Sequence, residues 1–252
     1  MAGTWLTSWT PEPFSRPVLL CLPQAGAGCG QFRPWQRHLG TELSVVGVQL
    51  PGRESRWADP EPSDVDEVVA GVTGELVAAL PPGQPVVIYG HSFGGLLGYE
   101  ITRRLGTAYG RWPNTLVVAA CRPPHMWVGA GSGLVDDEDE LVRLLAGRQL
   151  GADELDEDSR ELMLEVLRQD ARLSLSYVHR GDPHVPCSIE AWGGERDETV
   201  TADQLDGWGT YTAGSFCRRQ FSGDHYFTLT HLNLILPMLR AMATDASPAP
   251  AR

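Results

Sequence analysis

The sequence predicts an α/β fold in which helices cover both faces of a mostly parallel β-sheet. Short apolar runs bounded by glycine and proline recur along the chain, and stretches with helical periodicity separate them. Strands that alternate with helices in this way pair in parallel through right-handed crossovers. A chain of 252 residues suits one domain of this class, so we expect a single domain over residues 1–252.

The individual elements follow from these patterns in order along the chain. Apolar runs typical of strands buried on both faces lie at residues 18–23, 43–52, 85–90, 115–120 and 186–194 and, as a final strand, near 216–221. Helical patterns cover residues 32–39, 64–80, 94–105 and, near the end, 228–242. Ser63 is the expected N-cap of the second of these helices. The tail over about 245–252 is expected to be disordered.

The segment from about residue 127 to 183 interrupts this alternation, because it contains amphipathic helical stretches over 138–146 and 159–177 but no strand. We expect it to be an inserted helical lid over the edge of the sheet that carries the chemistry. Residues 134–170 hold 13 acidic residues and four arginines, a charge of −9 within the total of −12. We interpret these acids as the solvated outer face of the lid.

Composition argues against several classes of function. The net charge of −12 disfavours nucleic acid and anionic membranes as partners. No apolar run approaches the roughly 18 residues that a membrane span needs, and the chain does not begin like a signal peptide, so we expect a cytoplasmic protein. The five cysteines include no CxxC pair and predict neither a disulfide framework nor a zinc site: Cys21, Cys29, Cys121, Cys187 and Cys217.

The strongest functional signal is the GxSxG sequence over residues 90–94, which places Ser92 at its centre. This sequence directly follows an apolar strand and directly precedes a helix, which is the setting of the nucleophile in the α/β-hydrolase fold. Small neighbours allow the strained turn that would hold Ser92 at the carboxyl end of the sheet. The alternative is a glycine-rich helix start with a capping serine.

A serine nucleophile needs a base and an acid, which follow it along the chain in this fold. His225 is the predicted base, because it lies in a loop just after the last strand, whereas His231 falls within the last helix. Asp197 is the predicted acid, since glycines release the chain from the strand that precedes it. Glu195 and Asp224 compete for this role. His91 lies inside the GxSxG motif and is expected to pack beneath the serine turn. The other histidines have no strand-end context: His38, His125, His179 and His184.

The tetrahedral intermediate of acyl transfer requires backbone N–H donors for its oxyanion. The N–H of Phe93 follows the nucleophile, and the N–H of Ala25 is the second candidate, in the loop 23–28 after the first strong strand. A glycine-rich loop can instead bind phosphate. This loop lacks the Lys-Ser/Thr pair of a P-loop and the spacing of a dinucleotide site.

Taken together, these motifs resemble the type II thioesterases of polyketide and nonribosomal peptide assembly lines. The resemblance covers nearly the whole chain, through LCLPQAGAG with FRPW, VQLPGRESR, GHSFGG, GGERDETV and FSGDHYF. It implies that the substrate is an acyl chain on the phosphopantetheine of a carrier protein, that the segment 127–183 is a mobile lid, and that no metal or cofactor takes part. At the position of Gln24 the family often has histidine or another polar residue, and this variation leaves the role of the Ala25 N–H untouched.

Other functions remain open at this stage. A small-molecule carboxylesterase or lipase would use the same residues on an oxygen ester, and a non-catalytic interaction module or a cyclising release domain are further alternatives. We expect a monomer. Since carrier proteins are commonly acidic, we expect the lid to repel them and exposed arginines to attract them, with these candidates: Arg53, Arg56, Arg103, Arg104, Arg218 and Arg219.

Overall fold

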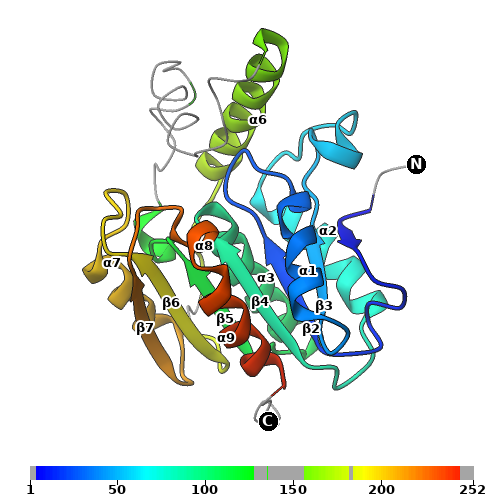
Figure 1. Ribbon diagram of the computed structural model, residues 1–252, viewed down its shortest axis with the longest axis vertical. Helices are drawn as coiled ribbons and strands as arrows, with labels where there is room; N and C mark the ends of the chain where they lie inside the picture. Colours follow the sequence, from blue (N-terminus) through cyan, green and yellow to red (C-terminus); the bar gives the residue numbers. More distant parts are fainter. Residues whose placement is uncertain (1–3, 128–134, 136–155, 182–183, 245–252) are drawn as a thin grey trace.

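Seven strands form one sheet at the centre of the molecule, in the order β1-β3-β2-β4-β5-β6-β7 (Figure 1). The computed structural model describes residues 4–127, 135, 156–181 and 184–244. The strands are β1 (Leu6–Ser8), β2 (Val18–Leu22), β3 (Ser44–Val48), β4 (Val86–His91), β5 (Thr115–Ala119), β6 (Ser188–Gly194) and β7 (Phe216–Phe221). Neighbouring strands pair in parallel, except that β1 pairs with β3 in the antiparallel sense. The mostly parallel sheet and its six predicted strands are thereby confirmed.

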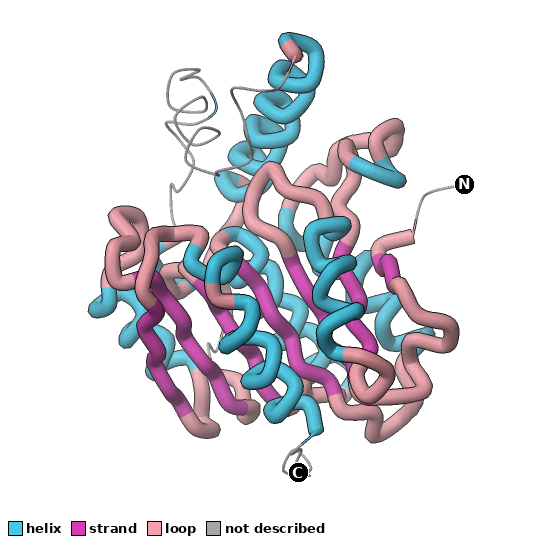
Figure 2. The backbone as a smooth tube through the Cα atoms, in the orientation of Figure 1, coloured by secondary structure: helices cyan, strands magenta, loops and turns pink. Residues whose placement is uncertain are grey.

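Helices cover both faces of this sheet, as expected (Figure 2). The α-helices are α1 (Arg33–Leu39), α2 (Val65–Ala79), α3 (Phe93–Tyr109), α6 (Glu157–Leu175), α7 (Ala202–Asp206), α8 (Phe227–Thr230) and α9 (Leu232–Thr244). Short 3-10 turns are η1 (Cys29–Phe32), η2 (Glu54–Arg56), η3 (Pro124–Met126) and η5 (Gly207–Tyr211). The structure confirms the predicted helix over 159–177 in α6, whereas the predicted helix 138–146 and the tail 245–252 lie outside the described residues.

Two apolar cores form, one on each face of the sheet. On β2, Val18, Leu20 and Leu22 pack with residues of α2 and α3, whereas Leu19 and Cys21 pack with residues of α1 and α9. Successive side chains of a strand point to opposite faces, so a strand covered on both sides needs apolar residues at every position. This explains why the central strands appear in the sequence as unbroken apolar runs.

The N-cap of α2 differs from the prediction by one residue. The Asp64 side chain accepts a hydrogen bond from the backbone N–H of Glu67 at 2.8 Å, so Asp64 and not Ser63 is the cap. The Ser63 hydroxyl and N–H instead donate to the Glu67 carboxylate, each at 2.8 Å. Both residues are good caps, and only the backbone conformation at Asp64 decides between them.

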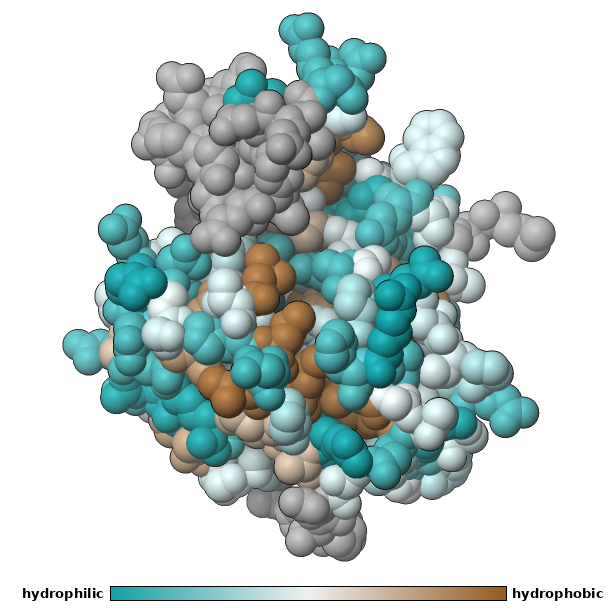
Figure 3. All heavy atoms as spheres, viewed as in Figure 1, coloured by the Kyte–Doolittle hydropathy of each residue, from teal (hydrophilic) through white to brown (hydrophobic). Residues whose placement is uncertain are grey.

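Helix α6 rises above the edge of the sheet where the parallel strands end (Figure 1). It buries Leu164, Val166, Leu167 and Leu173 and exposes the acids at its start, as expected for the outer face of the segment. Apolar residues gather at the surface over α8 and α9 (Figure 3), and these helices include the exposed side chains of Leu229 and Leu234. Among the described residues, no helix is both long and apolar enough to cross a membrane.

Candidate active site

Ser92 occupies a strained turn between β4 and α3. Its backbone has φ 52° and ψ −119°, a conformation that costs a side-chain-bearing residue about 1–3 kcal/mol. The Ser92 N–H donates to the Ala119 carbonyl of the neighbouring strand at 2.7 Å, which fixes the turn against the sheet. The serine is half-buried and stands directly after the carboxyl end of β4.

Two glycines make this turn sterically possible. A Cβ on Gly90 would clash with the carbonyl oxygen of Gly94, and a Cβ on Gly94 would clash with the carbonyl oxygens of Leu22 and Pro23. The second contact brings the start of α3 against the end of β2 and the loop that follows it. Gly94 therefore joins the serine turn to the start of the loop 23–28.

Asp197 and His225 meet across the ends of β6 and β7. The Nδ1 atom of His225 lies 2.9 Å from Oδ2 of Asp197. The Asp197 side chain is fully buried, whereas 16% of the His225 side chain is exposed. A Cβ on Gly194 would clash with the carbonyl oxygen of Asp224, so the glycine lets the two strand-end loops approach each other.

The surroundings of Asp197 stabilise its charged form. Burial by itself raises the pKa of this carboxyl, but the hydrogen bond from His225, the charge of His225 and two backbone N–H groups outweigh it and lower the pKa below its usual value. Those groups belong to Thr199 and Val200, whose nitrogens lie 2.8 and 3.0 Å from Oδ1. Asp197 is thus held as an oriented carboxylate.

The competing carboxylates and histidines have other surroundings. Glu195 is exposed, and Asp224 accepts a hydrogen bond from the N–H of Tyr226 within its own turn, at 2.8 Å. His231 is hydrogen-bonded through Nε2 to Ser222 at 2.9 Å and through Nδ1 to the carbonyl of Phe227 at 3.0 Å. Of the predicted candidates for the acid and the base, the structure pairs Asp197 with His225.

The His225 ring lies beside the serine turn. It packs edge-on against the ring of His91, the residue before Ser92, with a centroid distance of 5.3 Å. His91 is buried and stacks on Tyr226 at 6.1 Å, so it packs beneath the turn as expected. Ser92, Asp197 and His225 all follow the carboxyl ends of parallel strands, which brings the three residues to one edge of the sheet.

The two segments expected to supply oxyanion donors lie against each other. Phe93 is the first residue of α3, where backbone N–H groups point away from the helix without a partner in it. In the loop 23–28, the N–H of Ala27 donates to the Gln24 carbonyl at 3.1 Å, and Gly26 has a left-handed φ of 72°. The Gln24 side chain is buried and accepts a hydrogen bond from Gln31 at 3.3 Å.

One buried acid beside the loop 23–28 was not predicted from the sequence patterns. Asp170, counted among the solvated acids of the lid, is 1% exposed on α6 and receives a hydrogen bond from the N–H of Gly26 at 2.5 Å. The helical spacing indicates that Asp170 lies on a buried face, because Val166, Leu167 and Leu173 are three or four positions away and form the apolar face of α6. An acid inside an apolar helical stripe needs a buried partner.

That partner is Arg53, which overturns part of the expectation about docking arginines. Arg53 is 7% exposed and forms an ion pair with Asp170 at 2.6 Å, and Arg56 is 5% exposed and pairs with Asp59. Neither guanidinium can attract a carrier protein from solution. Three further candidates form ion pairs on the protein itself: Arg103 with Glu100, Arg218 with Asp206 and Arg219 with Glu190.

The five thiols of the chain are potential nucleophiles as well, and four of them are buried. Burial raises the pKa of Cys187 to about 12, and burial together with Glu54 raises that of Cys29 to about 12. Thiols held in their protonated form are poor nucleophiles. Among the described residues, no cluster of three or more His, Cys, Asp or Glu side chains is arranged to hold a metal ion.

The chain is similar in sequence and in structure to known thioesterases. The model of the family described as thioesterase domain matches residues 17–242. Thioesterase PikA5 of Streptomyces venezuelae is 31% identical over 230 residues, which cover 90% of this chain and 80% of PikA5. The solved type II thioesterase BorB, from the borrelidin biosynthetic cluster, superimposes with a TM-score of 0.83 at 30% identity, over 96% of this chain and 99% of BorB. RedJ, a thioesterase of the prodiginine pathway in Streptomyces coelicolor, gives a TM-score of 0.82 at 30% identity, over 91% of this chain and 92% of RedJ.

Proposed function

Because the chain belongs to the thioesterase family, we propose that it is a type II thioesterase of a polyketide or nonribosomal peptide pathway. Its substrates are acyl groups bound as thioesters to the phosphopantetheine of carrier proteins. Hydrolysis frees the carrier for another round of synthesis, which is an editing role. The observation that carries this proposal is the pairing of Asp197 with His225 beside the Ser92 turn, in a chain matched by the thioesterase family over residues 17–242.

In the proposed mechanism, the Ser92 hydroxyl attacks the thioester carbonyl while His225 accepts its proton. The buried Asp197 carboxylate, which lies against Nδ1 of His225, keeps the Nδ1 proton in place. Nε2 then acts as the base, and the carboxylate stabilises the imidazolium that forms. The N–H groups of Ala25 and Phe93 bind the oxyanion. Collapse of the intermediate expels the thiolate of the pantetheine arm, which takes up the proton from His225.

The second half of the reaction hydrolyses the acyl-enzyme. A water molecule gives its proton to His225 and attacks the Ser92 ester, and the acid leaves as the serine regains its hydrogen. A thioester suits this machinery because the thiolate is a good leaving group and needs little assistance. The segment 127–183, which contains α6, serves as the lid over the acyl chain within the single domain.

The proposal is tested by comparing three substrates with the same acyl group. We expect kcat/KM to be highest for the acyl carrier protein, lower for free acyl-pantetheine and lowest for the matched oxygen ester. Mass spectrometry of the carrier should show loss of the acyl mass with wild-type protein and none with Ser92→Ala. Preference for the oxygen ester would instead identify a small-molecule esterase or lipase, and hydrolysis of none of the three would identify an interaction module.

A further inference from the structure

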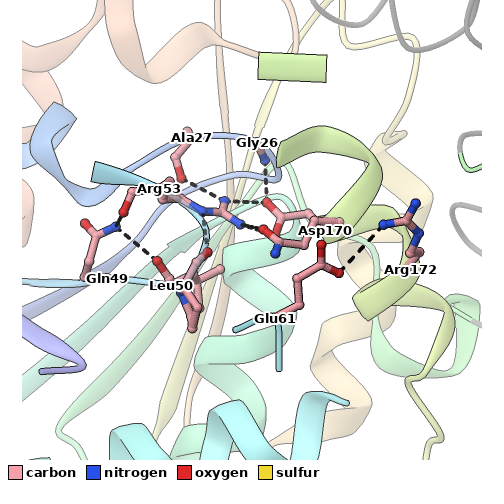
Figure 4. Close-up of polar contacts among 10 residues, drawn as sticks. Gly26, Ala27, Gln49, Leu50, Arg53, Glu61, Asp170 and Arg172 are labelled. Carbon is pink, nitrogen blue, oxygen red and sulfur yellow. Dashed lines mark hydrogen bonds and ion pairs between the residues drawn. The ribbon is translucent and has the colours of Figure 1, made fainter. Parts of the chain in front are cut away.

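A buried ion pair joins α6 to the loop that carries the predicted oxyanion donor (Figure 4). The Asp170 carboxylate accepts two hydrogen bonds from the Arg53 guanidinium, from Nη2 to Oδ1 and from Nη1 to Oδ2, both at 2.6 Å. Oδ2 of Asp170 also accepts a hydrogen bond from the backbone N–H of Gly26, at 2.5 Å. This bidentate arrangement gives the strongest hydrogen bonding between arginine and a carboxylate. Both side chains are buried. The carboxylate thus links three segments of the chain.

The guanidinium of Arg53 extends this link to the far side of the loop. Its Nη1 donates to the Ala27 carbonyl at 3.2 Å, and its Nε donates to the Pro51 carbonyl at 3.3 Å. The loop is therefore held at two successive points, by Asp170 at the Gly26 N–H and by Arg53 at the Ala27 carbonyl. Gly26 has a left-handed φ of 72°, and the bend that this gives the loop directs the Gly26 N–H and the Ala27 carbonyl toward the Asp170–Arg53 ion pair.

These contacts bear on the direction of the Ala25 N–H. That N–H shares a peptide plane with the Gln24 carbonyl, which accepts the N–H of Ala27 at 3.1 Å. Because the described peptide bonds are trans, fixing the carbonyl on one side of the plane fixes the N–H on the other. The same loop touches the serine turn, since a Cβ on Gly94 would clash with the Pro23 carbonyl. A shift of the loop therefore moves the Ala25 donor relative to Ser92.

We infer that Asp170 is a positioning residue for the oxyanion hole, through which α6 and Arg53 hold the loop 23–28 in its catalytic conformation. This inference rests on the proposed function, because it assumes that the Ala25 N–H binds the oxyanion. It also gives α6 a second role besides covering the acyl chain. The hole is complete only when the Asp170 end of α6 is seated on the loop.

Asp170→Asn tests this role with little change in volume. The amide loses the charge that holds Arg53 and one of the two acceptor atoms, so the loop is less well fixed. We expect kcat to fall about 10- to 100-fold with KM changed less than about twofold, because the oxyanion forms only in the transition state. Glu100→Gln is the matched control, since the hydrogen bonds of Glu100 go to Tyr177 at 2.7 Å, just after α6, and to Arg103 at 3.1 Å, both outside the loop. It should lower the melting temperature and leave kcat close to that of the wild type.

A transition-state mimic separates positioning from stability. When Ser92 adds to an alkyl trifluoromethyl ketone, its proton passes to His225 and the carbonyl oxygen becomes an oxyanion. Asp170→Asn should weaken binding of this ketone by the same factor as kcat, whereas binding of the matching non-hydrolysable thioether should not change. If Asp170→Asn fails to fold, Arg53→Lys is tested in its place. Lysine retains the positive charge but cannot form the bidentate hydrogen bonds, and about a 3- to 10-fold loss of kcat is expected.

Equal ketone binding by the variant and the wild type, or a loss of kcat no greater than in Glu100→Gln, would show that the ion pair is only structural. An aryl ester of the same acyl group is assayed in parallel, because it forms the same oxyanion. If the wild-type protein hydrolyses the aryl ester but no thioester, the proposed function is wrong. The role of Asp170 is then still tested by comparing the variants on the aryl ester.

Discussion

Replacement of Asp197 by asparagine changes the protonation of His225 while leaving the site in place. The two backbone N–H groups that now bind Oδ1, from Thr199 and Val200, can still bind the amide oxygen. The amide NH2 group then takes the place of Oδ2, 2.9 Å from Nδ1 of His225. Because an NH2 group donates, Nδ1 must accept, and the single proton of the neutral ring moves to Nε2.

A histidine protonated at Nε2 cannot take the proton of Ser92. We therefore expect Asp197→Asn to reduce kcat about 10⁴-fold, which corresponds to about 5.5 kcal/mol in the activation free energy. Oxyanion stabilisation and substrate binding remain, so activity should stay above the uncatalysed rate. Since each hydrogen bond of the carboxylate has a counterpart in the amide, the free energy of unfolding at neutral pH should change by only about 1 kcal/mol.

The assay is steady-state hydrolysis of an acyl-pantetheine thioester by Asp197→Asn and by Glu195→Gln, with circular dichroism to confirm folding. Glu195 is the matched control, because it is an exposed carboxylate two positions earlier in the same turn. It should retain nearly full kcat. The assignment is refuted if Asp197→Asn stays within about tenfold of the wild type while Glu195→Gln loses most of its activity.

Further predictions concern strain, packing, titration and the thiols. Ser92→Gly should be about 1 kcal/mol more stable than Ser92→Ala in chemical denaturation, because only glycine adopts φ 52° without strain, and equal stabilities would contradict this. Gly94→Ala should lower both the melting temperature and kcat, because its Cβ meets the Leu22 carbonyl, whereas Gly74→Ala, with open space around it in α2, should gain up to about 1 kcal/mol. The lowered pKa of Asp197 contributes stability that is complete above the ordinary carboxyl pKa and is lost as pH falls through the folded-state pKa, so the stability difference between wild type and Asp197→Asn should shrink in acid. Iodoacetamide should modify Cys217 before the buried cysteines and spare activity, as read by intact mass, while a fluorophosphonate should modify Ser92 and abolish it.

Local patterns in the sequence were enough to predict most of the fold. The central strands are apolar at every position because helices cover both their faces, and this leaves a mark on each strand separately. The three-residue strand β1 left no such mark, since it is half-buried at the edge of the sheet and paired on one side only. The serine turn was also predictable, because its glycines, its strand and its helix are adjacent in the chain.

The sequence by itself determined which residue types could form the site, and the tertiary structure decided which of them meet. The chain order placed Asp197 and His225 after strands, but only the packing of the two loops separates Asp197 from Glu195 and Asp224. The link between Asp170 and Arg53 spans 117 positions, and that between Asp170 and Gly26 spans 144. A contact over such a distance has no periodicity or spacing that reveals it. An acid in the apolar stripe of α6 shows that it needs a partner, and only the folded chain shows that the partner is Arg53.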